Sequence, residues 1–366
     1  MSLMEHTLLW FGAALSLNGL AAGTLMAASN LSALSLLVGQ LLGCILLGLG
    51  GRIGAVTGRN SMECISLSLG RWPMMAVSVL GTVYQIGCMA VTFAVAAPLA
   101  SELIGGSLIG WCAVLGLCSL LWLYAGQTGH HQCNSIGAAL LVVVCLAVCI
   151  CYQGDGVPIP EKARSFSHGV WISAALPISF LPMAADSVSR QLRARAAYWL
   201  AAIAFGMGSL IACSMGILLM NNGHSELPAG LMTVFVLLST LTTVYLYARS
   251  AGMAMEQALP KIRGKRVSRL AVVLGALIAV CVPVSWFGDI FVIACAVMIP
   301  LFTIVFMDFF VLHHYDTARR ADVHNLILWA VCIALSLLLM QVTHFGELLT
   351  AVLTAGLCVL TRTLRT

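Results

Sequence analysis

The chain has 366 residues, of which 61% are hydrophobic and only 8% are charged, and its formal net charge is +5. Its mean hydropathy is +1.02, whereas soluble domains carry about a quarter charged residues. This composition excludes an ordinary soluble domain and predicts an all-α protein embedded in a lipid bilayer.

Apolar stretches long enough to cross roughly 30 Å of hydrocarbon recur along the whole sequence. They predict about twelve transmembrane helices in a single transporter-like domain (1–366), with no room for a soluble domain. The predicted spans are 8–28, 32–51, 74–98, 108–125, 136–152, 169–187, 197–220, 230–257, 270–287, 289–311, 324–342 and 345–361.

Lysine and arginine are distributed asymmetrically between the two sides of these spans. With the amino terminus inside, only Lys162 and Arg164 lie outside, and Arg249 lies within a span. This positive-inside bias predicts a multi-pass protein of a bacterial-type cytoplasmic membrane, with both termini in the cytoplasm. It also accounts for the net charge, so the sequence gives no indication of nucleic-acid binding. The cytoplasmic cations are Arg52, Arg59, Arg71, Arg190, Arg193, Arg195, Lys261, Arg263, Lys265, Arg266, Arg269, Arg319, Arg320, Arg362 and Arg365.

The first span is interrupted by small and polar residues at Ser16, Asn18, Gly19 and Gly23. Two interpretations are open. Small residues let membrane helices pack closely, whereas a broken helix near the bilayer midplane is a recurrent way for a transporter to form its binding site.

The third span carries Tyr84, Cys88 and Thr92 at intervals of four, so these side chains share one helical face. Gln85 flanks this face. Thr92 and Gln85 could hydrogen-bond to a polar substituent of a substrate.

The sixth span contains the segment PISFLPMAADSVSR from Pro177 to Arg190. Proline removes a backbone donor and clashes with the preceding turn, so the helix is expected to break near Pro182. Irregular backbone at membrane depth requires burial in protein or a cavity. Ser179 and Phe180 are therefore predicted to line a substrate site.

The interruptions of the first and sixth spans occupy corresponding places in two halves of five spans. Matching interruptions indicate an inverted-repeat transporter. The predicted repeats are 1–152 and 169–311, followed by two extra helices in 324–366.

The eighth span contains four hydroxyl residues within five positions, followed by Tyr247. These hydroxyls, together with backbone carbonyls of the first span, are the oxygen ligands that a hard cation prefers. Alternatively, they bond to their own preceding carbonyls, as membrane threonines commonly do. The four residues are Ser239, Thr240, Thr242 and Thr243.

Arg249 is unusual because a charge within a span is costly unless it reaches water or a partner. It either snorkels to the cytoplasm or forms a gating ion pair with Asp186. Arg190 competes for that pairing, since it lies four residues from Asp186.

The remaining reactive residues give little support for an enzyme. The nine histidines lie at span edges or in loops, no CxxC spacing occurs, and the paired acids within spans that a proton relay would use are missing. We therefore expect no cofactor and no metal beyond a possible coupling ion, Na⁺ or H⁺.

Several segments together resemble the nucleobase:cation symporter-1 family. The break in PISFLPMAADSVSR is similar to the P-aromatic-x-P-x-x-x-D pattern of its sixth helix, and Ser239–Gly252 is similar to its eighth helix. The segments WFGAALSLNGLAAGTLMA and GRIGAVTGRNSMECISLSLG resemble its first helix and the loop after its second. Within the family, the chain most resembles the branch assigned to hydroxymethylpyrimidine transport and thiamine salvage. The resemblance implies the broken-helix, five-plus-five inverted-repeat fold.

Carried onto this sequence, the family pattern implies that Phe180 stacks on the substrate ring. Cys88 stands where the family has a second stacking tryptophan, and Thr92 matches a polar residue one turn further on. Tyr247 falls near the amide or acid that grips the substrate. The implied cation ligands are Thr242, with Thr243 or Ser239, and carbonyl groups near Leu15 and Asn18.

The sequence thus predicts a secondary transporter that imports a small pyrimidine-type heterocycle with a cation. Asn18 could donate to a ring nitrogen and accept from an exocyclic amine. Gly19 and Tyr84 complete the predicted substrate site. The alternatives are a transporter of the same fold for an amino acid or other small metabolite, and a membrane sensor without transport. An intramembrane enzyme is a more distant alternative. The exact substrate, the coupling ion and the oligomeric state are open.

Overall fold

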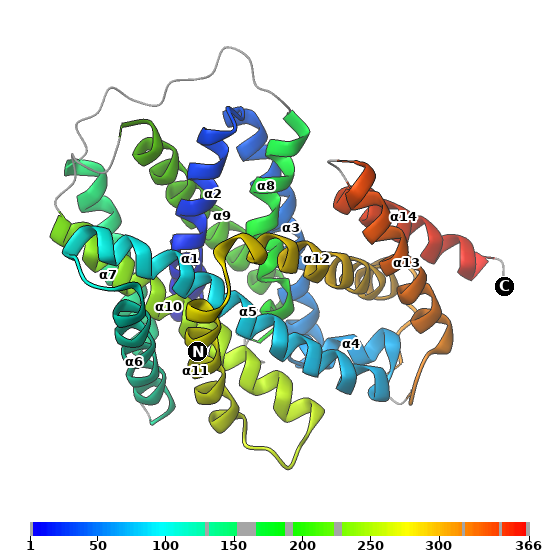
Figure 1. The fold of residues 1–366 in the computed structure, drawn as a ribbon. Helices are drawn as coiled ribbons and strands as arrows, with labels where there is room; N and C mark the ends of the chain where they lie inside the picture. The colour runs from blue at the N-terminus through cyan, green and yellow to red at the C-terminus, as the bar shows by residue number, and fades with distance from the viewer. Residues whose placement is uncertain are drawn as a thin grey trace.

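A computed structural model describes residues 3–128, 132–151, 166–186, 193–222, 229–316, 319–343 and 346–363. Throughout these residues the regular structure is helical, which confirms the predicted all-α fold (Figure 1). The elements are α1 (Leu3–Ala14), α2 (Leu17–Ala28), α3 (Ala33–Thr57), α4 (Ser61–Leu69), α5 (Arg71–Ile104), α6 (Leu108–Gln127), α7 (Cys133–Cys151), α8 (Phe166–Ser179), η1 (Leu181–Met183), α9 (Ala194–Asn222), α10 (Ala229–Ala258), α11 (Gly264–Cys281), α12 (Val284–Phe306), η3 (Met307–Val311), α13 (Val323–Val342) and α14 (Gly346–Thr363).

The helices reproduce the predicted spans. Among the described residues, eight are long and apolar enough to cross a membrane, and the bent pair α1–α2 passes the same test as a ninth span. The other three predicted spans coincide with α7, α11 and α14. Two of these are shorter apolar helices, and α11 begins with the charged residues Lys265, Arg266 and Arg269.

The first span breaks at Leu15 and Ser16, where the chain bends by 41° between α1 and α2. Ser16 has extended backbone angles, and its side chain accepts a hydrogen bond from the Gly19 amide at 3.3 Å. This is the ordinary N-cap arrangement, in which a short polar side chain satisfies a donor at the start of a new helix. Both break residues are fully buried, so the irregular backbone is enclosed by protein.

The sixth span breaks where the prolines predict it. Helix α8 ends at Ser179, the 3-10 turn η1 contains Pro182, and the chain continues in turns to Asp186. Residues 187–192 lie outside the described part of the chain, and they include the predicted gating residue Arg190.

The helices sort into two groups by their packing. The broken-helix group consists of α1, α2, α3, α8 and η1, and α9, in which α3 packs on α8 and α9 while α1 and α2 pack on α9. The scaffold group consists of α5, α6, α10 and α11, and the α5–α10 pair makes its most extensive contact. Exchanging the first five spans for the second five maps the contact of the first span (α1 and α2) with α9 onto the contact of the sixth span (α8 and η1) with α3. An inverted repeat produces such a pattern.

Glycines make the closest approach within the broken-helix group. A Cβ atom at Gly23 would collide with the carbonyl group of Cys213 in α9, and one at Gly216 would collide with the Leu20 carbonyl in α2. A Cβ atom at Gly19 would lie 2.8 Å from that of Ala212. This geometry therefore favours the interpretation that Gly19 and Gly23 allow close helix packing.

The segment after the second span, predicted as a loop, contains the short helix α4. Its start has a capping box, because the Asn60 side chain accepts from the Glu63 amide while the Glu63 carboxylate accepts from the Asn60 amide. The spacing of Asn60 and Glu63 is a recognisable sign of a helix start, and it could have indicated this helix from the sequence.

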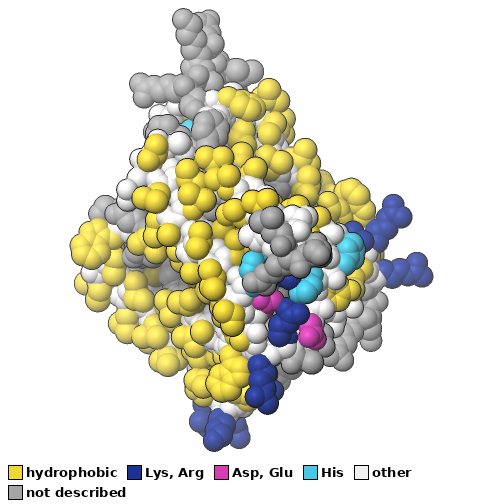
Figure 2. Space-filling view, turned by 90° about the vertical axis from the view of Figure 1, so that its right-hand side faces the viewer, with side chains coloured by type: hydrophobic (Ala, Val, Ile, Leu, Met, Phe, Trp, Pro, Cys, Tyr) yellow, Lys and Arg dark blue, Asp and Glu magenta, His cyan; other side chains and the backbone are white. Residues whose placement is uncertain are grey.

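Helices α13 and α14 pack beside α12 at the right of Figure 1, and α13 also contacts α4. Asp308 of η3 interacts with Arg362 of α14 and Asn325 of α13. Turned toward the viewer, this side of the molecule is covered largely by hydrophobic side chains, with Lys and Arg gathered at its lower and right edges (Figure 2). A broad apolar surface with cations gathered toward one end is what a bilayer-spanning protein presents.

Candidate functional site

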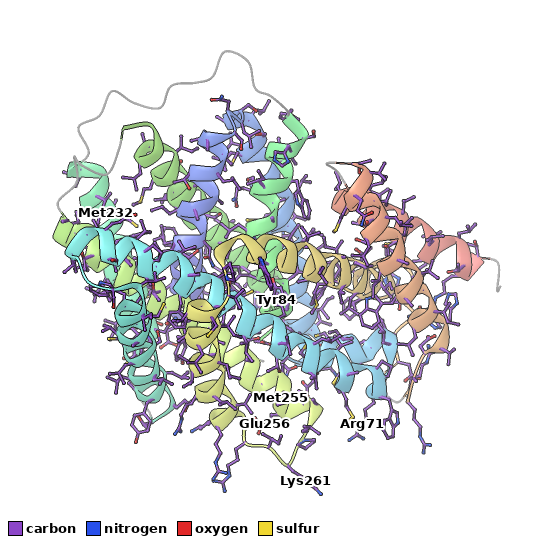
Figure 3. The ribbon with its side chains drawn as sticks, viewed as in Figure 1. Arg71, Tyr84, Met232, Met255, Glu256 and Lys261 are labelled. Carbon is purple, nitrogen blue, oxygen red and sulfur yellow. The ribbon has the colours of Figure 1, made fainter. Side chains whose placement is uncertain are left out.

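The two broken helices bring their irregular backbone against α5 and α10 of the scaffold group. From the α1–α2 break, the Asn18 amide nitrogen lies 3.4 Å from the Thr92 hydroxyl of α5. From the α8 break, the carbonyl of Ser179 accepts a hydrogen bond of 2.9 Å from the hydroxyl of Tyr84, which lies near the centre of the molecule (Figure 3). Tyr84 and Thr92 thus use the shared face that their spacing predicts.

Asn18 retains an unused acceptor. Its Oδ1 atom is buried and has no hydrogen-bond partner within the described part of the chain. The Tyr247 hydroxyl lies beside Asn18, Ser179 and Cys88, but no hydrogen bond of normal geometry reaches Oδ1. A buried acceptor without a partner is costly, so this atom is suited to receive an N–H or O–H group from a ligand.

Phe180 lies in an aromatic cluster at the second break. Its ring stacks on Tyr247 of α10, with centroids 5.3 Å apart and an interplanar angle of 27°. Phe205 of α9 meets the Phe180 ring edge-on at 5.0 Å. All three rings are essentially inaccessible to solvent, so Tyr247 covers one face of the ring predicted to stack on a substrate.

The side chains of Cys88 and Gln85 on α5 contact different neighbours. The Cys88 thiol lies between the hydroxyl groups of Tyr84 and Tyr247, close to the aromatic cluster. Gln85 instead points to the Asp186 end, where its Nε2 atom donates to the Ser250 hydroxyl at 3.3 Å. The structure therefore brings Cys88 to the predicted substrate site and places Gln85 away from the predicted stacking ring.

Three of the four clustered hydroxyls of α10 are satisfied by their own helix. Ser239 and Thr240 donate to the Val236 carbonyl, and Thr242 donates to that of Leu238. Thr243 differs, because its buried Oγ1 atom has no partner among the described residues. Of this cluster, Thr243 is the hydroxyl that is not held by its own helix, while the oxygens of all four keep lone pairs that could coordinate a cation.

Asp186, which follows the 3-10 turn of the broken sixth span, connects this segment to α4 and α10. One carboxylate oxygen accepts a 2.8 Å hydrogen bond from the Ser61 amide of α4, and the other accepts a 2.6 Å bond from the Ser250 hydroxyl of α10. The Ser61 hydroxyl in turn accepts from the amide of Ala185 at 2.9 Å. Asp186, Ser61 and Ser250 are called the carboxylate latch below.

Arg249 is exposed and takes part in none of the ion pairs found within 4.0 Å among the described residues. Arg249 and Asp186 both border a cavity of about 10 Å³ that is also lined by Trp10 and Met183. The exposed side chain agrees with the snorkelling interpretation of Arg249. Asp186 is held by hydrogen bonds to Ser61 and Ser250 instead of by an ion pair with Arg249.

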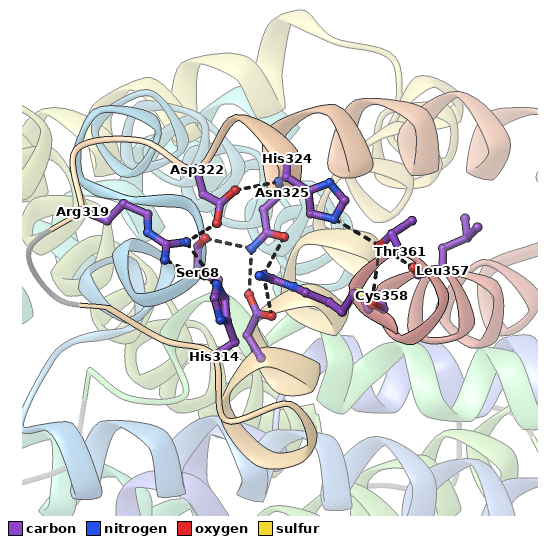
Figure 4. Close-up of polar contacts among 11 residues, drawn as sticks. Ser68, His314, Arg319, Asp322, His324, Asn325, Leu357, Cys358 and Thr361 are labelled. Carbon is purple, nitrogen blue, oxygen red and sulfur yellow. Dashed lines mark hydrogen bonds and ion pairs between the residues drawn. The ribbon is translucent and has the colours of Figure 1, made fainter. Parts of the chain in front are cut away.

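Sequence reasoning missed a second polar group, which we call the C-terminal cluster (Figure 4). Asp308, only 1% exposed, pairs with Arg362 of α14 at 3.2 Å. The Asn325 amide donates to Asp308 at 2.7 Å and to the Ser68 carbonyl of α4 at 2.8 Å. A carboxylate inside the predicted span 289–311 was the available signal. A cavity of about 770 Å³ opens beside the cluster, but its arginines Arg319 and Arg362 are already paired with carboxylates.

Comparison with known proteins shows the fold. No family model matches the chain, and no curated protein is similar enough in sequence to count as a relative. Among solved structures, Mhp1, a nucleobase-cation-symport-1 family transporter closed around bromovinylhydantoin, is 18% identical, with a TM-score of 0.70 over 98% of this chain and 91% of that chain. Its inward-facing conformation is 17% identical, with a TM-score of 0.68 over 99% and 91% of the two chains. A Na⁺-coupled sialic acid symporter in a substrate-bound outward-open state is 11% identical, with a TM-score of 0.68 over 98% and 88%. The chain therefore has the fold of polytopic cation-coupled transporters.

Proposed function

We propose that this protein is a secondary active transporter that imports a small pyrimidine-type heterocycle together with a cation. The observation that carries the proposal is the meeting of both broken helices with the scaffold group, at Asn18–Thr92 and at Phe180–Tyr247. A ligand held there would contact both groups at once. Rocking the groups against each other would then expose it to either side of the membrane.

The chemistry of these residues favours an aromatic ring with a hydrogen-bonding edge. Phe180 supplies a ring face, and the unpartnered Oδ1 of Asn18 can accept from a ring N–H or an exocyclic amine. The Mhp1 structure holds bromovinylhydantoin, itself a small heterocycle. Hydroxymethylpyrimidine, a related thiamine precursor or a cytosine-like base fits this description.

The present contact between Phe180 and Tyr247 leaves no room for a substrate ring between them. Two stacked contacts of about 3.5 Å each need about 7 Å between the outer rings, whereas these centroids are 5.3 Å apart. Substrate binding at this face therefore requires Tyr247 to separate from Phe180. Because the two residues belong to different helix groups, movement of one group against the other would produce that separation.

The coupling cation is assigned in this proposal to the α10 hydroxyls and the first break. Thr243 supplies a free oxygen, with Thr242, Ser239 and the backbone carbonyls of Leu15 and Asn18 completing the coordination. Oxygen ligands of this kind suit Na⁺, and the fold is shared with a symporter described as Na⁺-coupled.

The first experiment measures uptake of labelled hydroxymethylpyrimidine into cells that lack other pyrimidine carriers, with and without Na⁺, alongside cytosine and a panel of amino acids. Phe180→Leu keeps an apolar side chain but removes the ring face, so apparent affinity should fall roughly fivefold for the loss of about 1 kcal/mol of stacking. Phe306→Leu, in α12, is the matched control. Uptake of amino acids alone would favour the other substrate class, and binding without uptake would favour a sensor.

We further propose that the carboxylate latch closes the cytoplasmic side of the site. Ser250→Ala removes a hydrogen bond to a charged group and should favour the open state by roughly 1.5–3 kcal/mol. In a background without other cysteines, a cysteine at Met183 should then react faster with a charged alkylating reagent applied from the cytoplasm. Ser268→Ala, which removes a hydroxyl bonded only to the Gly264 carbonyl of its own helix, should leave this rate unchanged. Equal rates in the two variants would contradict the latch.

A further inference from the structure

Five cations lie within nine residues at the turn between α10 and α11. Lys261, Arg263, Lys265, Arg266 and Arg269 are all exposed. The turn lies at the lower edge of the molecule, where Figure 3 shows Lys261 and Arg71 on the same side. The positive-inside bias explains why cations gather on this side, but it does not explain how their side chains are arranged.

Two of the five are held against α6. The Lys265 ammonium donates to the Gln127 carbonyl at 3.0 Å, and Arg269 donates to the Gln127 side chain at 3.1 Å. The Arg269 guanidinium also lies 5.5 Å from the centre of the Tyr124 ring. These contacts direct both side chains toward the neighbouring helix and away from the outer face of α11.

The other three cations outnumber the one acidic residue near them in the sequence. Lys261, Arg263 and Arg266 take part in none of the ion pairs found within 4.0 Å in the described ranges. Glu256 is the only acidic residue between positions 250 and 270, and its carboxylate lies against the backbone of Gly264. The charge of this turn is therefore available to an anion from outside the chain.

The arginines continue directly into an apolar stripe on the outer face of α11. Arg266, Leu270, Leu274 and Leu277 follow one another at helical spacing, and the three leucines are 58%, 37% and 55% exposed. Ala271, Val272 and Gly275 are buried on the other face, where Gly275 packs against Met89 of α5. The stripe therefore faces the surroundings and not the protein core.

The dimensions of this surface match one leaflet. At about 1.5 Å per residue, Leu270 to Leu277 covers about 10 Å, and the hydrocarbon half of a bilayer is about 15 Å thick. With the leucines at acyl-chain depth, Arg263 and Arg266 stand at the level of the lipid phosphates. Arginine also matches phosphate geometry, because its planar guanidinium can donate two parallel hydrogen bonds.

We propose that the start of α11 is a binding site for an anionic phospholipid. Arg263 and Arg266 hold its phosphate, Lys261 adds positive charge, and one acyl chain lies along Leu270, Leu274 and Leu277. The uncompensated charge favours a headgroup with net negative charge, such as that of phosphatidylglycerol, over a zwitterionic one. This inference does not depend on the transported substrate.

The test uses the purified full chain in detergent, with bound phosphatidylglycerol counted by native mass spectrometry against phosphatidylcholine. Replacing both arginines (Arg263→Gln with Arg266→Gln) should weaken phosphatidylglycerol binding roughly 30-fold, at about 1 kcal/mol per cation. Arg266→Gln alone should weaken it roughly fivefold on the same basis, which keeps the test informative if the double variant is unstable. The matched control, Arg193→Gln with Arg195→Gln, removes two exposed cations near the start of α9 and should have little effect.

A second arm separates a lipid from free phosphate. Leu277→Ser should weaken phosphatidylglycerol binding several-fold with both arginines intact, because it removes apolar contact with the chain. Inorganic phosphate at millimolar concentration should not displace the lipid. Equal binding of phosphatidylcholine, or no effect of the arginine variants, would overturn the proposal. Displacement by phosphate, with no effect of Leu277→Ser, would reduce the site to a phosphate site and overturn the lipid assignment.

Discussion

At the scale of single residues, the candidate site differs from the family pattern at two of three positions. Phe180 keeps the stacking aromatic, whereas Cys88 stands in place of the second aromatic and Tyr247 in place of the amide or acid. Cys88 is small and lies beside Tyr84 and Tyr247, whereas Tyr247 itself covers Phe180. Under the proposed function, Tyr247 of α10 would supply the second stacking ring that Cys88 cannot. We infer that a substrate beside Cys88 would meet a smaller side chain than tryptophan, which would admit a ring substituent such as a methyl group, which cytosine lacks.

Cys88→Trp tests this selectivity. The larger side chain should fill the space and reduce uptake of methyl-substituted pyrimidines relative to cytosine, by on the order of tenfold for the 1–3 kcal/mol that one methylene is worth in a pocket. The measurement is the ratio of uptake rates for the two substrates in one preparation. Cys112→Trp would add bulk to a buried cysteine in α6, and its ratio should stay that of the parent protein. An unchanged ratio in Cys88→Trp would contradict the assignment.

At the scale of helices, close packing fixes how α2 sits against α9. Gly23 and Gly216 bring one helix into contact with carbonyl groups of the other, because no Cβ atom intervenes. Membrane helices gain most of their mutual attraction from such van der Waals contact. The same contact keeps the broken first span in register with the rest of its group.

Gly23→Ala is expected to destabilise the protein by roughly 1–3 kcal/mol, since an added methyl group must push α2 away from α9. Gly87→Ala is the matched control: it lies within α5 with nothing inside 4 Å of the new methyl group. There the substitution should be neutral, or stabilising by about 0.5–1 kcal/mol. Thermal unfolding in detergent compares the two, and equal midpoints would contradict the packing role of Gly23.

At the scale of the whole molecule, α4 links the candidate site to the two C-terminal helices. Its first residue, Ser61, holds Asp186 of the broken helix, and Ser68 near its end accepts from Asn325 of the C-terminal cluster. The connection before α13 adds backbone bonds, since the Asp316 amide donates to Leu67 and the Asp322 amide to Leu69. The extra helices are thus attached through polar contacts as well as through apolar packing.

Asp308→Asn should destabilise the protein by about 3–5 kcal/mol, because it leaves the Arg362 charge largely buried without its partner. The double variant Asp308→Asn with Arg362→Gln removes both charges and should lose less than either single change. The unfolding free energies of the parent protein, the two single variants and the double variant form a double-mutant cycle. Additive losses would show that the two residues do not stabilise each other.

The sequence by itself determined the helical membrane fold, the positions of the spans and the break near Pro182. These follow from local chemistry: hydropathy sets where a helix can cross lipid, and an interior proline removes a backbone hydrogen bond and so weakens the helix. Proline alone is not decisive, because Pro98 and Pro300 lie inside α5 and α12. The sequence also indicated the shared face of Tyr84 and Thr92, because helical periodicity fixes which side chains lie together. The same kind of local signal, the Asn60–Glu63 capping box, could have located α4.

Only the tertiary structure decided which residues meet across helices. Stacking of Tyr247 on Phe180, the latch of Asp186 with Ser61 and Ser250, and the pairing of Asp308 with Arg362 all join segments far apart in the chain. The choice among the α10 hydroxyls also needed it, since all four have the same composition signal but only Thr243 is left without a backbone partner in the part of the chain described. Hydropathy and periodicity describe one helix at a time, whereas these contacts depend on how helices rotate and cross when they pack.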